Sequence, residues 1–74
     1  MVELVRTNDL VLVSWLTAAL AAEGIGAVVL DTHTSVLEGS IAAIPRRVMV
    51  EEGALARARL LLQEGEAAVR DAVS

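Results

Sequence analysis

The chain has 74 residues, of which 55% are hydrophobic, and its formal net charge is −4. This length fits one domain, residues 1–74, near the lower size at which packing alone can hold a fold together. Because the sequence has no cysteine and only one histidine, it excludes disulfides, thiolate metal sites and a pair of histidine ligands from one chain. We expect no metal, no cofactor and no catalytic residues.

The charge and hydropathy patterns argue against nucleic acid and membranes as partners. Nucleic-acid binders present a basic surface that displaces counterions, whereas the six arginines here are scattered among ten acidic residues. The longest apolar run, Leu10 to Ala22, is too short to span a bilayer and contains Ser14 and Thr17. Acidic residues before this run, and the lack of a cleavage pattern after it, do not fit a signal peptide, so we expect a cytoplasmic protein.

The first part of the chain predicts a strand followed by a helix. Val2 to Arg6 is rich in β-formers, and the cluster after it is typical of a helix N-terminus, with Thr7 or Asn8 as the cap. Apolar residues then recur at helical spacing as far as Glu23, and Gly24 suits a left-handed C-cap. The residues of this helical stripe are Val13, Leu16, Ala19 and Leu20.

Two further strands and a loop are expected next. Ile25 to Asp31 is nearly continuously apolar, which indicates a strand that is covered on both faces or lies at a subunit contact. Residues 32–43 form a loop that is long for so small a domain. Ile44 to Glu51 is the third strand, with Pro45 at its start because proline lacks an N–H.

The last part of the chain predicts a second helix from Gly53 to Gln63. Its apolar side is formed by Leu55, Ala58, Leu61 and Leu62. We expect Gly65 to stop or bend this helix, which leaves a core of residues 2–64 and a C-terminal helical extension or tail of residues 65–74.

The element order β-α-β-β-α predicts an α+β fold. The two strands that flank the first helix are expected to be parallel, joined by a right-handed crossover, while the second and third strands form an antiparallel pair. This is a truncated ferredoxin-like arrangement, with a three-stranded mixed sheet and two helices on one face.

Four segments within residues 3–64 resemble a small bacterial family of unknown function described as "putative prokaryotic signal-transducing protein". The segments are ELVRTND, LAAEGI, VLD and IPRRVMVEEGALARARLLL. The residues that carry the resemblance are Leu20, Gly24, Ile25, Val48, Val50, Ala54, Ala58 and Leu62. The resemblance implies a fold similar to that of the PII (GlnB-like) signalling proteins, whose long loop between the second and third strands corresponds to residues 32–43. No residue that binds a ligand in the PII proteins can be assigned to a position of this sequence from the resemblance.

Three residues are candidates for ligand binding: His33, Arg46 and Arg47. The arginines stand where the long loop becomes a strand, so they form either an anion site or the polar rim of the sheet. Because strand neighbours point to opposite faces, Arg46 and Arg47 share a ligand only if the strand is bulged or frayed. His33 is either a ligand contact or an ordinary loop residue.

Two apolar patches are candidates for an interface. Trp15 shares a helix face with Val11, away from the main stripe, so it either anchors a subunit contact or turns into the core of its own chain. The candidates on the open face of the sheet are Met49, Val5 and one of Val28 or Val29.

These apolar patches predict a homodimer. The function that the sequence favours is a small, non-enzymatic binding or regulatory module, with a protein partner contacting loop 32–43. The alternative is a PII-like sensor that binds a nucleotide or another small anion near residues 32–47. An enzyme is the third hypothesis, and it requires a buried cleft that holds His33 with a carboxylate.

Overall fold

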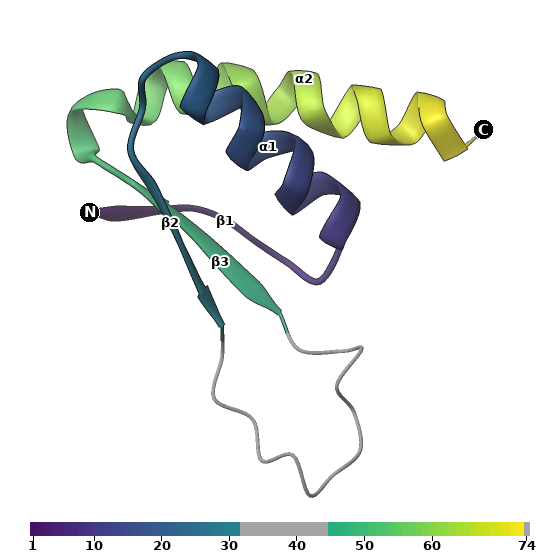
Figure 1. Cartoon of the computed structure of the whole chain (residues 1–74), viewed down its shortest axis with the longest axis horizontal. Coiled ribbons are helices and arrows are strands. Elements are labelled where there is room, and N and C mark those ends of the chain that lie inside the picture. The colour runs from purple at the N-terminus through teal and green to yellow at the C-terminus, as the bar shows by residue number, and fades with distance from the viewer. Residues whose placement is uncertain (32–44, 74) are drawn as a thin grey trace, which may run out of the picture.

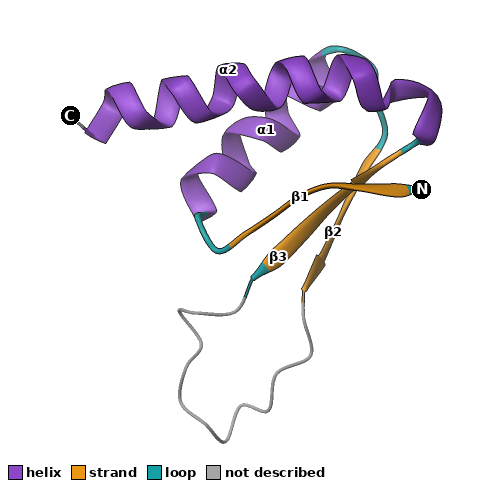
Figure 2. Ribbon diagram, turned by 180° about the vertical axis from the view of Figure 1, so that it is seen from behind, coloured by secondary structure: helices purple, strands orange, loops and turns teal. Residues whose placement is uncertain are grey.

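The computed structural model describes residues 1–31 and 45–73, so His33 and the predicted loop of residues 32–43 lie outside the described residues. The elements, in chain order, are β1 (Val2–Thr7), α1 (Leu10–Ala22), β2 (Ala27–Asp31), β3 (Arg46–Val50), the short 3-10 helix η3 (Glu52–Ala54) and α2 (Leu55–Val73) (Figure 1). The fold is α+β, as predicted, with two helices layered on a three-stranded sheet (Figure 2). No helix within the described ranges is long and apolar enough to cross a membrane.

The sheet has the strand order β1-β3-β2, and both hydrogen-bonded pairs are antiparallel. The prediction of a mixed sheet is therefore wrong. β1 and β2 do run in the same direction, but β3 lies between them, so no parallel pair forms. The central position of β3 leaves β1 and β2 as the two edges of the sheet.

β1 departs from regular alternation. Its register against β3 shifts between Glu3 and Val5, so that Val2 lies opposite Val50 and Val5 lies opposite Val48. A β-bulge of this kind adds one residue and reverses the faces of those that follow. Val5 consequently packs against the core, and its predicted place on the open face is wrong.

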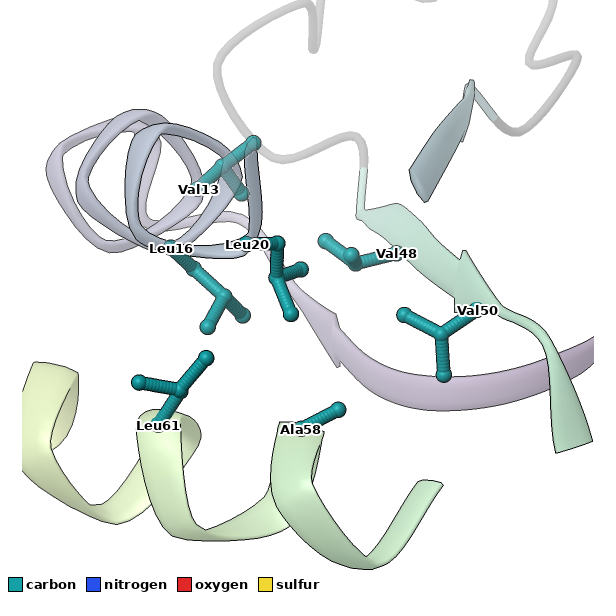
Figure 3. Close-up of a cluster of buried hydrophobic side chains, with 7 residues drawn as sticks. All are labelled: Val13, Leu16, Leu20, Val48, Val50, Ala58 and Leu61. Carbon is teal, nitrogen blue, oxygen red and sulfur yellow. The ribbon is translucent and has the colours of Figure 1, made fainter. Parts of the chain in front are cut away.

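The hydrophobic core lies between the two helices and one face of the sheet (Figure 3). Its buried residues are Val13, Leu16, Leu20, Val48, Val50, Ala58 and Leu61. The main stripes predicted for both helices are thereby confirmed. Each fully buried Leu or Val side chain contributes about 1.5–3 kcal/mol to the free energy of folding relative to an exposed one, and this burial fixes which face of the sheet the helices cover.

The ends of α1 are set by local hydrogen bonds and by one glycine. Asp9 is the N-cap, because its Oδ1 accepts hydrogen bonds from the N–H groups of Val11 (3.0 Å) and Leu12 (3.2 Å). The predicted caps, Thr7 and Asn8, are therefore wrong. The Thr7 hydroxyl instead accepts from the N–H of Asp9 (3.0 Å). At the other end Gly24 has a φ of +73°, which confirms the left-handed C-cap.

α2 continues through Gly65 to Val73, so the predicted stop at Gly65 is wrong. Glycine inside a helix costs about 1 kcal/mol relative to alanine, so its place needs a packing reason. A Cβ on Gly65 would lie 2.7 Å from Cε3 of Trp15 and 3.2 Å from Cδ1 of Leu12. The glycine therefore lets α1 approach α2 closely and accommodates the indole ring.

Candidate functional site

The face of the sheet opposite the helices is the candidate binding surface, and we call it the open sheet face. The buried side chains of Val48 and Val50 point to the helices (Figure 3), so the intervening Met49 and the preceding Arg47 face the other way. The register extends this face to both edge strands. Its members are Glu3 and Arg6 of β1, Val28 and Leu30 of β2, and Arg47 and Met49 of β3.

Two arginines meet on the open sheet face. Arg6 of β1 lies directly opposite Arg47 of β3 in the antiparallel register. Arg6 also donates a hydrogen bond from Nη2 to Oε1 of Glu3 at 3.3 Å, in an exposed ion pair. Like charges directly opposite each other destabilise a sheet, and Glu3 pairs with Arg6, so a further carboxylate or phosphate between the two arginines would offset the remaining repulsion. Arg6 is not among the candidates that the sequence predicts, because only the register of β1 against β3 shows its neighbour.

The adjacent arginines of β3 do not form one site. Arg46 lies opposite Thr7 on β1 and Asp31 on β2, which places it on the helix-covered face. Arg47 lies opposite Arg6 and Leu30, on the open sheet face. Both arginines are half-buried. The structure therefore separates the two residues that the sequence makes neighbours, and it brings Arg47 to Arg6 instead.

Apolar side chains occupy the β2 side of the open sheet face. Val28 and Leu30 keep 44% and 37% of their surface exposed, and Met49 between them and β1 is half-buried. Val29 is on the other face of β2, yet it is 38% exposed as well. The open sheet face thus combines arginine side chains with a strip of uncovered hydrocarbon, the composition typical of the centre of protein interfaces.

Trp15 and Val11 have different surroundings, although they share a helix face. Trp15 is half-buried and packs against Gly65 of α2 and the core. Val11 is 63% exposed. The indole ring of Trp15 therefore makes an intramolecular contact at the junction between the two helices, whereas Val11 is exposed to solvent.

A further ion pair joins the helices. Nε of Arg57 on α2 donates to Oε1 of Glu23, the C-cap of α1, at 2.6 Å. This hydrogen bond, with the attraction of the two charges, lowers the pKa of the Glu23 carboxyl and raises the pKa of Arg57. The pair is exposed, so its contribution is screened by solvent and salt.

Residues 1–31 and 45–73 contain no pocket and no group of three or more histidine and acidic residues that could hold a metal ion. What the described part of the chain offers a ligand is the open sheet face, which can bind through arginine hydrogen bonds, apolar contact or both. Comparison with known proteins adds a family. Residues 1–66 match the model of a family described as "Putative prokaryotic signal transducing protein". No curated protein matches the chain.

Proposed function

Because the chain belongs to the family described as "Putative prokaryotic signal transducing protein", we propose that it is a small dimeric binding module of the cytoplasm that transmits signals by protein contacts, without catalysis. The observation that carries this proposal is the open sheet face, which neither helix covers and on which Arg6 and Arg47 lie beside Met49. Loop 32–43, which the sequence suggests as the contact with a protein partner, lies outside the described residues.

The proposal includes a truncated ferredoxin-like architecture. Three observations support it: β1 and β2 run in the same direction, β3 lies between them, and α1 connects the first two strands. The similarity to PII signalling proteins is part of the same proposal and concerns the architecture, since no residue of a PII ligand site is carried over.

The chemistry of the open sheet face selects the kind of partner. Arg6 and Arg47 would pair with a carboxylate, because guanidinium groups hold planar anions through two hydrogen bonds. Met49, Val28 and Leu30 would contact apolar side chains, with about 25 cal/mol gained for each Å² of apolar surface removed from water. We therefore expect a peptide segment in which an acidic residue stands near large hydrophobic ones.

A peptide library displayed on phage tests this function without knowledge of the partner. Selection on the immobilised protein should enrich segments that combine acidic and hydrophobic residues, and calorimetry should show about tenfold weaker binding to the Arg47→Glu variant. Arg59→Glu is the matched control, because Arg59 is an exposed arginine on α2. Failure to enrich any segment, or enriched segments that bind Arg47→Glu as well as the unaltered protein, would contradict binding at this face.

The second candidate function is a sensor for a nucleotide or another small anion. The direct opposition of Arg6 and Arg47 favours it, because two guanidinium groups on adjacent strands suit a phosphate. ATP, GTP and inorganic phosphate would raise the melting temperature, and Arg47→Gln would abolish the shift while Arg59→Gln retained it. A melting temperature that none of these anions changes would rule out this sensor.

A further inference from the structure

The outer edge of β2 is exposed and apolar. β2 pairs with β3 on one side, and no described strand lies on its other side. In the described part of the chain seven large hydrophobic side chains are exposed, and three of them, Val28, Val29 and Leu30, are consecutive residues of β2. An edge strand with unpaired N–H and C=O groups and apolar side chains on both faces is a ready template for another strand.

α1 lies over the same edge of the sheet. It contacts β2 and β3, whereas the main strand contact of α2 is with β1. Trp15 and Leu12 face Gly65 of α2, so helical periodicity directs Ser14, Thr17 and Ala21 to the opposite flank of α1, beyond β2. We call these three residues the outer flank of α1.

The outer flank of α1 has an unusual composition for a helix at the surface. All 13 residues of α1 are uncharged, while surface helices normally carry charged or polar residues on the side away from the core. Leu10, at the start of the same flank, is 58% exposed. The β2 edge and the outer flank of α1 therefore form two layers of one uncharged side of the molecule.

We propose that a second copy of this chain covers that side, through antiparallel pairing of the two β2 strands about a two-fold axis at Val29. The inference rests on the proposed dimer and names its interface. The two three-stranded sheets would then join into one continuous sheet. Val29 faces Val29 of the second copy, while Val28 faces Leu30, so exposed apolar residues meet on both sheet faces.

The helix layer fits the same two-fold axis. Because α1 lies over β2 and β3, pairing of the β2 edges brings the two α1 helices to about two strand spacings from each other, roughly 10 Å. Helices pack at 8–10 Å between axes, and the small side chains of Ser14 and Ala21 permit the closer part of that range. Since neither α1 carries a charge, this approach buries no unpaired charge.

A second copy fits this side better than a bound peptide strand does. A peptide that added one strand to β2 would cover the strand edge and leave the outer flank of α1 in water. A second copy presents a strand and a helix in the same two layers, so one symmetry operation covers both, as in the isologous interface of a two-fold dimer. The other edge strand, β1, is less suited to pairing because it carries a bulge together with Glu3 and Arg6.

Single-cysteine cross-linking tests the interface and its register. The sequence contains no cysteine, so the thiol in the Val29→Cys variant can only pair with its own copy. Directly opposed residues in an antiparallel pair have Cα atoms about 4.5–5.5 Å apart, a distance that a disulfide spans. Under mild oxidation Val29→Cys should form a covalent dimer about tenfold faster than Leu60→Cys, a control on α2 that is 51% exposed.

Two further variants test the same interface if the Val29→Cys variant fails to fold. Val28→Cys and Leu30→Cys should each cross-link slowly alone, because each new cysteine lies diagonally from the same cysteine of the second copy. When the two variants are mixed they should cross-link quickly, because residue 28 of one copy lies directly opposite residue 30 of the other. Circular dichroism verifies that each variant is folded. Equal rates at Val29→Cys and Leu60→Cys, or slow cross-linking in the mixture, overturn the β2 interface.

Sedimentation of the unaltered protein distinguishes a wrong β2 interface from a wrong proposal that the protein is a dimer. A dimer that does not cross-link through β2 overturns the interface and leaves the dimeric module standing. A monomer at millimolar concentration overturns both the interface and the dimeric part of the proposed function.

Discussion

β1 and β2 are the two edges of the same sheet, and each pairs with β3 on one side. β1 carries a bulge and the exposed ion pair between Glu3 and Arg6. β2 has regular register along its whole length and exposes Val28, Val29 and Leu30. Bulges and charges are the means by which native sheets prevent edge pairing. This protein therefore protects one edge of its sheet and leaves the other suited to association.

The bulge in β1 has a consequence for the core as well as for the edge. It turns Val5 to the helix-covered face, opposite Val48, where strict alternation would turn it to the open sheet face. The protected edge therefore contributes to folding, whereas the exposed side chains of β2 remain available for a partner. Four experiments test this difference between β1 and β2.

The largest effect is expected from Val5→Asp. The new carboxylate would be placed against the core, so the free energy of unfolding should fall by about 3 kcal/mol. Urea denaturation followed by circular dichroism measures the change. Glu3→Asp is the matched control on the open sheet face of β1 and should change the stability little. A Val5→Asp variant as stable as this control would show that Val5 faces solvent, and that the bulge does not turn it inward.

Gly65→Ala should have the next largest effect, and it tests the orientation of α1 over β2. The added Cβ would lie 2.7 Å from Trp15, so overpacking of about 1–3 kcal/mol should outweigh the better helix propensity of alanine. Gly53→Ala is the control, because nothing lies within 4 Å of a Cβ there. A stabilised Gly65→Ala variant would mean that Trp15 does not dock on α2, and the outer flank of α1 would then lose its assigned direction.

A charge pair on β2 tests the unprotected edge directly. Val28→Lys and Leu30→Glu should each weaken the proposed dimer by about 10- to 100-fold, because each places an unpaired charge opposite an apolar residue. An equimolar mixture of the two variants should regain association, since the new lysine then lies opposite the new glutamate. Sedimentation equilibrium measures both effects. Leu60→Lys, on α2, should leave the dimer unchanged, and a mixture no tighter than its components would contradict the two-fold register.

Local pattern predicted the elements and most of the core, because helical spacing and strand composition act over a few residues. The stripe of Val13, Leu16 and Leu20 and the C-cap at Gly24 are of this kind. The strand order, the bulge before Val5 and the opposition of Arg6 and Arg47 depend on pairing between distant segments. No local pattern in the sequence indicates that pairing, which explains why the prediction of a mixed sheet is wrong and why Arg6 is not among the predicted candidates.

The role of Gly65 differs from the predicted helix stop for a related reason. A glycine inside an apolar helical pattern indicates a stop when only its own helix is considered. Its use here depends on Trp15, which is fifty positions away in the chain and approaches it across the helix pair. The same pairing gives Trp15 an intramolecular contact that helical periodicity alone left undecided.

The smallest effect is expected at the ion pair between Glu23 and Arg57, on the α2 side of α1. The hydrogen bond from Arg57 holds the pKa of the Glu23 carboxyl below its ordinary value of about 4.5. A carboxyl whose pKa is lower in the folded state stabilises the fold above its unfolded pKa and loses that contribution as the pH falls through its folded pKa. Stability should therefore decline slightly as the pH falls below about 4.5.

Arg57→Gln should remove this part of the decline and raise the pKa of Glu23, as followed by the carboxyl carbon shift in NMR. Arg59→Gln is the control on the same helix and should leave the pKa of Glu23 unchanged. A Glu23 pKa that does not respond to Arg57→Gln would mean that the two side chains do not pair in solution. The C-cap of α1 would then have no ion pair with α2, and the uncharged outer flank beside β2 would no longer contrast with a charged contact on the α2 side.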